Sequence, residues 1–164
     1  MDYSIQHIAI IVLVLLTGLS AGLCFTWSNV ITQGIGRLDH FSYLNAFQQM
    51  NRSIINPLFI IVFFGPFFLG LLNIYLFKNE IGPIIWILII SIAFYFCGVL
   101  LVTMFGNVPL NDLLDKSDLS KASVEDLKLL RNQFEVKWNR LHFIRTISST
   151  ISFTLLILTL LIKK

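Results

Sequence analysis

The chain has few charged residues, and this deficit excludes an ordinary soluble domain. Only 13% of its 164 residues are Asp, Glu, Lys or Arg, whereas 56% are hydrophobic. A soluble domain has about 25% charged residues. The net charge of +3 is small and spread along the chain, so the sequence gives no support for nucleic-acid binding.

Patterns that bind metals or cofactors are also missing. The histidines are His7, His40 and His142, without paired spacing, and the two cysteines lie in separate apolar segments. Zinc and haem sites usually show paired ligands in the sequence. No glycine-rich phosphate loop or nucleophile elbow occurs. The sequence therefore predicts no metal and no cofactor.

The chain does contain four long apolar segments, each close to the ~20 residues that a helix needs to cross a bilayer. No Lys or Arg precedes the first of them, which favours a transmembrane helix over a cleaved signal peptide. The sequence predicts one all-α integral membrane domain over residues 1–164. Its four-transmembrane-helix bundle is expected to have spans at about 8–27, 56–77, 83–105 and 142–162.

The distribution of basic residues predicts an orientation. Nine of the twelve Lys and Arg residues lie in or beside the long loops 28–56 and 106–142. By the positive-inside rule these loops are cytoplasmic and both termini are outside. We expect a multi-pass protein of a bacterial cell membrane.

Both long loops have helical patterns. Asp39 can cap a helix over 39–55, and no Gly or Pro interrupts 123–162. At ~1.5 Å per residue the second helix is about 60 Å long, so residues 123–141 form a stalk that packs against 39–55. Two long helices therefore extend beyond the bilayer on one side. Between them, Gly106 and Pro109 predict a tight turn over 106–111.

A polar face lies where the stalk enters the last apolar segment. Glu135, Trp138, His142 and Arg145 are spaced 3, 4 and 3 residues apart, which places them on one helix face. Histidine can exchange protons near neutral pH, and an arginine can stabilise an anion. Trp and Arg are also ordinary anchors at a membrane interface. Glu135 lies one turn farther out and is assigned to the stalk surface.

Two further patterns have open interpretations. Six amides at a similar level predict a polar cavity, although each could instead cap a helix: Asn45, Gln48, Asn51, Asn56, Asn107 and Asn111. Gly18 and Gly22 form a small-xxx-small pattern, which lets helices approach closely. We expect this pattern to pack within the bundle; a homo-oligomer interface is the alternative.

Three blocks of the sequence resemble the anthrone-oxygenase-like family of small four-helix membrane proteins. They are Gly18-x-x-Ala21-Gly22 followed by Trp27, Thr103-x-x-x-Asn107-Val108-Pro109-Leu110-Asn111, and Trp138-x-x-x-His142-x-x-Arg145-Thr146. Most members are known only as a domain of unknown function. Those with a known activity oxidise anthrones to anthraquinones with molecular oxygen, without metal or flavin.

This resemblance leads to a hypothesis about the site. His142 is the base, Arg145 and Asn107 stabilise the anion, and Trp138 stacks on the rings. The other substrate-binding candidates are Trp27, Asn51, Asn56 and Asn111. The expected partners are the lipid bilayer and a lipophilic aromatic ligand.

The sequence thus favours a cofactor-free oxygenase-like protein that acts on an anthrone, phenol or quinol-type lipophile. The alternative is a non-enzymatic membrane protein that binds, transports or has a structural role.

Overall fold

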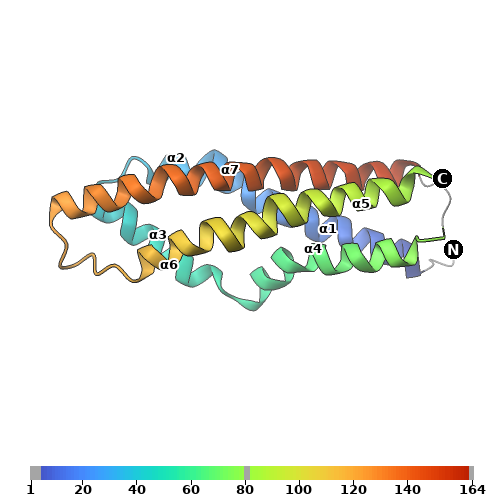
Figure 1. Cartoon of the computed structure of the whole chain (residues 1–164), viewed down its shortest axis with the longest axis horizontal. Helices are drawn as coiled ribbons and strands as arrows, with labels where there is room; N and C mark the ends of the chain where they lie inside the picture. Colours follow the sequence, from blue (N-terminus) through green and yellow to red (C-terminus); the bar gives the residue numbers. More distant parts are fainter. Residues whose placement is uncertain (1–4, 80–81, 163–164) are drawn as a thin grey trace.

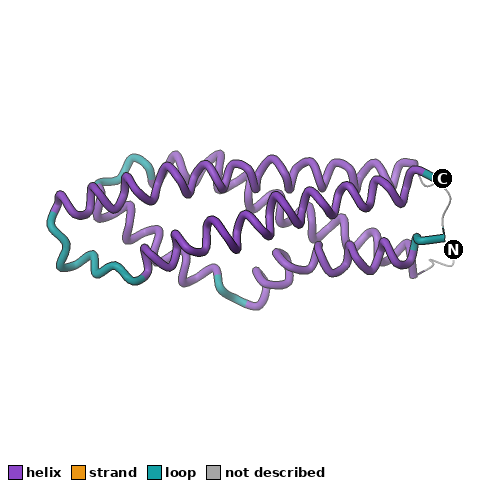
Figure 2. The backbone as a smooth tube through the Cα atoms, in the orientation of Figure 1, coloured by secondary structure: helices purple, strands orange, loops and turns teal. Residues whose placement is uncertain are grey.

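A computed structural model describes residues 5–79 and 82–162, which form an elongated helical bundle (Figure 1). Short loops connect the helices, and the described residues contain no strand (Figure 2). The elements are α1 (Ile5–Thr26), η1 (Trp27–Ile31), α2 (Thr32–Ile35), α3 (His40–Ile54), α4 (Pro57–Leu76), α5 (Pro83–Tyr95), η2 (Phe96–Leu101), η3 (Thr103–Asn107), α6 (Val108–Asp115) and α7 (Val124–Ile162), where η marks a π-helical turn.

Four helical segments of the bundle are long and apolar enough to cross a membrane. They are Ile5–Ile35, Pro57–Leu76, Pro83–Asp115 and Val124–Ile162. α1 packs against α4 and α7, and α5 packs against the same two helices. The predicted all-α fold with four membrane spans is therefore confirmed. The orientation of the long loops stays a prediction.

The stalk is confirmed as part of one unbroken helix. α7 has 39 residues, so its length is about 58 Å, nearly twice the ~30 Å of hydrocarbon in a bilayer. The Ser123 hydroxyl and Asp126 form a reciprocal cap at its start. Asp39 caps α3 as predicted, because its carboxylate accepts from the Ser42 amide at 3.0 Å. Hydrogen bonds from Ser42 lower the pKa of Asp39.

α3 and α4 are separate helices, and the chain between them, at Ile55 and Asn56, is not helical. Asn56 is extended, as expected for a residue before proline, and its carboxamide oxygen accepts from the Phe59 amide at 3.0 Å. Pro57 then begins α4, where its missing N–H costs nothing. The connection bends away from the other helices (Figure 2), and residues on both sides of it line a cavity.

The turn predicted over 106–111 is wrong, because the helix continues through it. Residues Thr103–Asn107 form η3, and α6 follows directly with Pro109 in its first turn. Inside a continuing helix a proline removes one intrahelical hydrogen bond; here it directly follows the π-helical turn, where the hydrogen-bond pattern of the helix already changes. Gly106 does not end a helix. It allows close packing, because a Cβ there would lie 2.9 Å from Leu141.

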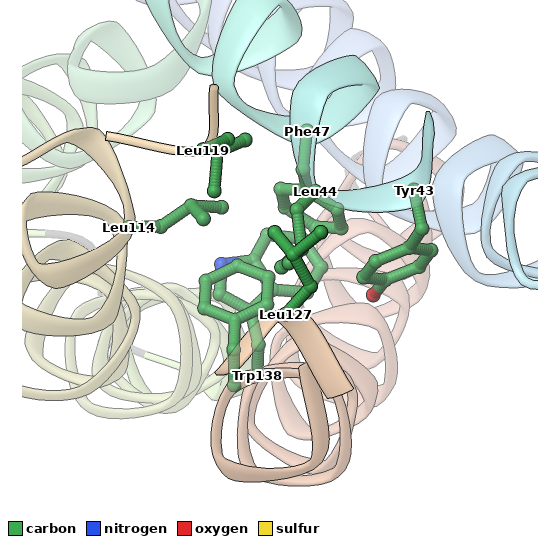
Figure 3. Close-up of a cluster of buried hydrophobic side chains, with 8 residues drawn as sticks. Tyr43, Leu44, Phe47, Leu114, Leu119, Leu127 and Trp138 are labelled. Carbon is green, nitrogen blue, oxygen red and sulfur yellow. The ribbon is translucent and has the colours of Figure 1, made fainter. Parts of the chain in front are cut away.

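The predicted packing of the stalk against the 39–55 helix is confirmed by a shared aromatic core (Figure 3). Phe47 of α3 lies edge-on to both Phe134 and Trp138 of α7, with ring centroids 4.7 Å apart in each pair. Leu114 from α6 joins the same core. Such pairs contribute about 0.5–1.5 kcal/mol beyond the area that they bury. The core fixes Trp138, one of the site candidates.

A buried arginine fastens the loop before α3 to the stalk. Arg131 donates to the carbonyl oxygens of Leu38 and Gly36 at 2.7 Å each and to the Glu135 carboxylate at 2.7 Å. Its guanidinium lies 4.2 Å from the centroid of the Tyr43 ring. Glu135 is thus part of a largely buried ion pair in the stalk rather than a solvated surface charge.

Replacing Arg131 with methionine should therefore destabilise the protein strongly. The variant leaves two carbonyl oxygens and the Glu135 carboxylate without their donor, and breaking a buried pair typically costs about 3–5 kcal/mol. We expect a loss of ~3 kcal/mol in the free energy of unfolding, measured by denaturation in mixed micelles. Arg140→Met, an exposed position on the same helix, is the control. Equal losses in the two variants would contradict this role.

The two small residues of α1 have different surroundings. A Cβ at Gly18 would lie 2.8 Å from the Phe153 ring of α7, whereas a Cβ at Gly22 would have no neighbour within 4 Å. Gly18 therefore permits close packing within the bundle. An oligomer formed through these glycines stays a prediction.

Candidate functional site

A cavity of about 920 Å³ lies beside the interruption between α3 and α4. Its wall comes from α1, η1, α3, α4, η3, α6 and α7. Seven of the eight site residues proposed from the sequence line it: Trp27, Asn51, Asn56, Asn111, Trp138, His142 and Arg145. The fold thus brings together residues that are far apart in the sequence; His142, for example, contacts Cys24, which lies 118 positions away.

His142 lines the cavity, and only one of its two ring nitrogens has a hydrogen-bond partner among the described residues. Its Nε2 lies 3.0 Å from the Cys24 carbonyl oxygen. A carbonyl only accepts, so Nε2 must carry the hydrogen. In a neutral imidazole the lone pair is then on Nδ1. Nδ1 is buried and has no hydrogen-bond partner within the part of the chain that the structure describes.

The carbonyl that orients His142 lies just before a π-helical turn. Cys24 precedes η1 (Trp27–Ile31) on the first membrane helix, and such turns are frequent at functional sites. The hydroxyl of Thr146 donates to the same oxygen at 3.2 Å. Two side chains of α7 therefore hydrogen-bond to one carbonyl oxygen of α1. The sequence could not reveal this partner, because a backbone carbonyl has no residue signature.

Two tryptophans form an aromatic wall beside His142. The Trp138 ring stacks on the imidazole with centroids 4.9 Å apart and an angle of 9° between the planes. Trp27 lies 5.4 Å from Trp138. The Trp138 indole N–H donates to the Asn111 carboxamide oxygen at 2.7 Å, which fixes the ring. The Trp27 indole nitrogen has no partner among the described residues.

Arg145 is a buried cation that has no carboxylate partner in the part of the chain that the structure describes. Its residue is 8% exposed, and its guanidinium lies 5.6 Å from the Phe63 ring centroid and beside the Cys24 side chain. Within residues 5–79 and 82–162, no acidic side chain forms an ion pair with it, and its Nε has no partner. A buried charge is costly unless paired, so this position favours an anionic ligand.

The predicted amide set divides into binding candidates and structural residues. Asn51 lines the cavity with a buried Nδ2 that has no partner among the described residues. Asn56 also lines it, but its side chain caps α4. Asn107 lies outside the lining and donates to the Trp138 carbonyl oxygen at 3.3 Å. Its geometry supports a positioning role instead of contact with an anion.

The sequence interpretation missed the polar end of the cavity. Arg52 and Asp115 form an ion pair of 2.7 Å there, and Asp112 lies beside them in the lining. Asp112 and Asp115 are one turn apart on α6. Their spacing was visible in the sequence, but the turn expected over 106–111 concealed that both lie on a helix that continues the third span.

The described residues contain no group of three or more His, Cys, Asp or Glu side chains that could hold a metal ion. The polar groups that line the cavity include an imidazole, two guanidiniums, amides and the carboxylates at its polar end. Together with the aromatic wall, they suit a planar organic molecule that loses a proton and becomes negatively charged.

Comparison with known families supports the resemblance noted in the sequence. A family model described as anthrone oxygenase matches residues 58–155. The matched region includes the block from Thr103 to Asn111 and the block from Trp138 to Thr146, whereas the block from Gly18 to Trp27 lies before it. No curated protein matches the chain, and no solved structure does.

Proposed function

The chain belongs to the anthrone oxygenase family, and from this premise we propose that it oxidises a hydroxyaromatic lipophile with molecular oxygen inside the membrane. The substrate class is an anthrone, phenol or quinol. The observation that carries the proposal is the pairing of a free Nδ1 on His142 with the unneutralised Arg145 in one cavity.

Binding is supported by the aromatic wall. A flat ring system gains contact area against Trp27 and Trp138, and aromatic pairs favour offset or edge-on arrangements. The unpartnered indole N–H of Trp27 and the amide of Asn51 are available to donate to a ring oxygen. Buried donors without partners are costly, so a ligand oxygen would satisfy them.

The first chemical step is removal of a proton. In an anthrone the proton leaves the ring carbon opposite the carbonyl, and the charge moves onto the carbonyl oxygen as an enolate. His142 Nδ1 accepts that proton, because its lone pair is free while Nε2 remains bonded to Cys24. Arg145 stabilises the enolate oxygen, which gives the buried guanidinium its missing anion.

The second step uses oxygen and needs from the chain only the proton that His142 accepted in the first step. The enolate transfers one electron to O₂, and the resulting radical pair forms a C–O bond to give a peroxide anion. The proton returns from His142 to the peroxide, which then loses water to form the second carbonyl. The sum is anthrone plus O₂ giving anthraquinone plus H₂O. The four electrons that reduce O₂ come from the two C–H bonds of the ring carbon that becomes the second carbonyl.

Oxidation of 1,8-dihydroxyanthrone by the protein in lipid nanodiscs tests this function. We expect O₂ and anthrone to be consumed one to one, at least ~100-fold faster than in empty nanodiscs. With ¹⁸O₂, mass spectrometry should find one labelled atom in the new ring carbonyl and the other in water. Binding without any acceleration would reject the oxygenase and favour the alternative of a non-enzymatic binding or transport protein.

A further inference from the structure

Part of the cavity lining is apolar and exposed within membrane-crossing helices. On α1, Leu19 is 57% exposed and Leu23 is 52% exposed; at the start of α4, Leu58 is 71% exposed. All three line the cavity. Exposed leucines in such segments face lipid. The cavity therefore borders on the bilayer between α1 and α4.

A glycine keeps this border open. Leu19, Gly22 and Leu23 lie on one face of α1 because they are three and four residues apart. Gly22 lines the cavity, and a Cβ there would have no neighbour within 4 Å. Gly18, one turn away, also lines the cavity, but a Cβ there would lie 2.8 Å from the Phe153 ring. The missing side chain of Gly22 thus leaves space, instead of serving a contact between helices.

The interruption of the bundle lies at the same opening. Ile55 and Asn56, which join α3 to α4, also line the cavity, and the chain there bends away from the other helices (Figure 1). Ile55 is 76% exposed. A continuous helix at this corner would cover the opening, whereas the broken one leaves it uncovered.

The other end of the cavity is polar. The ion pair between Arg52 and Asp115 lies there, with both side chains about half exposed. From Gly18 to Ile31 the lining extends along α1 and η1 over 13 residues, about 20 Å at ~1.5 Å per residue. The volume of about 920 Å³ is near the top of the ~300–1,000 Å³ found for drug-sized ligands. A bare tricyclic ring would leave much of it empty.

We propose that the natural substrate is a ring that bears a lipophilic tail and enters from the bilayer between α1 and α4. The ring lies against Trp138 and His142, and the tail passes Gly22 to reach lipid. The tail is an aliphatic chain, such as an alkyl or prenyl group, because leucines and the Gly22 gap form this part of the lining. The identity of the ring rests on the proposed function; the tail and its route rest on the cavity.

Binding of two hydroquinones that differ only in their tail tests this inference. 2-Decyl- and 2-methyl-1,4-hydroquinone are titrated under argon into nanodiscs that contain the full chain. In a Trp86→Phe background the remaining tryptophans are Trp27 and Trp138, so quenching of their fluorescence reports on the cavity. Under argon no oxidation occurs, and binding is measured separately from the proposed activity.

The informative variant is Gly22→Leu, with Gly34→Leu as its matched control. Gly34 also has no neighbour within 4 Å of a Cβ, but it is not part of the cavity lining. We expect Gly22→Leu to weaken binding of the decyl compound at least ~10-fold and of the methyl compound less than ~2-fold, because the leucine fills the tail route. Gly34→Leu should change neither, and comparison with wild type cancels partitioning into lipid.

Thermal melting of both variants confirms that each folds, and Gly22→Ala should give an intermediate effect. Equal weakening of the two compounds by Gly22→Leu, or no weakening of either, would overturn the tail route. Selective weakening together with failure of the oxygen assay would retain the tailed ligand and reject only the oxygenase.

Discussion

His142→Gln is expected to lower the rate of anthrone oxidation by about 10²–10³-fold with little change in the amount of folded protein. A glutamine amide can still donate to the Cys24 carbonyl oxygen, so the link between α7 and α1 is retained. The variant removes the Nδ1 lone pair, which is the only feature of the imidazole that the proposed base needs. Ring binding should change much less than the rate.

Oxygen uptake by the purified protein in nanodiscs measures this effect, with fluorescence quenching as the binding readout. His40→Gln is the control, since His40 is a histidine outside the cavity lining that also has a buried, unpartnered Nδ1. It should retain wild-type activity. If His142→Gln were as active as wild type, His142 would not be the base. If the variant failed to accumulate, its bond to Cys24 would be the main role of the side chain.

Arg145→Met should lower the same rate by a similar factor of about 10²–10³ for a different reason. Methionine keeps the apolar packing against Phe63 but removes the positive charge that stabilises the enolate oxygen. Loss of one preorganised group that stabilises an oxyanion typically costs about 10²–10³ in rate. Arg145→Lys should recover part of the activity, because the charge returns without the planar geometry of the guanidinium.

The two replacements of Arg145 also separate catalysis from anchoring. The methionine variant removes a buried, unneutralised charge, so it should melt at a temperature equal to or above that of wild type. An arginine that serves as a membrane anchor would instead be needed for stability. A methionine variant that is both active and less stable would contradict the proposed role. Arg140→Met, at an exposed position five residues before Arg145 and outside the cavity lining, should have no effect on the rate.

Much of the architecture could be predicted because the bilayer restricts the secondary structures that can cross it. Backbone groups in lipid must bond within a helix or barrel, so four apolar segments of ~20 residues lead to four helices. Caps such as Asp39 and the unbroken pattern of 123–162 are local signals, and the structure agrees with both. The pattern at Gly106 and Pro109 was misleading, because a proline in the first turn after a π-helical segment is compatible with a continuing helix.

For the candidate site, the sequence could predict which residues lie at a similar depth along the bundle, but not how they contact one another. The spacing of Trp138, His142 and Arg145 placed them on one face by the geometry of a single helix. Their individual roles depend on partners from other helices: Asn111 fixes Trp138, and the carbonyl of Cys24 fixes the tautomer of His142. Asn56 and Asn107 looked equivalent to Asn51 in the sequence, and contacts with α4 and α7 distinguish them.

The sequence by itself thus determined the membrane class, the helices, the family and the polar face of α7, because these follow from hydropathy, periodicity and local motifs. Only the tertiary structure decided that the face borders a cavity, that Arg145 has no carboxylate partner among the described residues, and that the cavity opens toward lipid beside Gly22. These features arise where seven helical elements meet, and the spacing within one helix contains no information about what the others place opposite it.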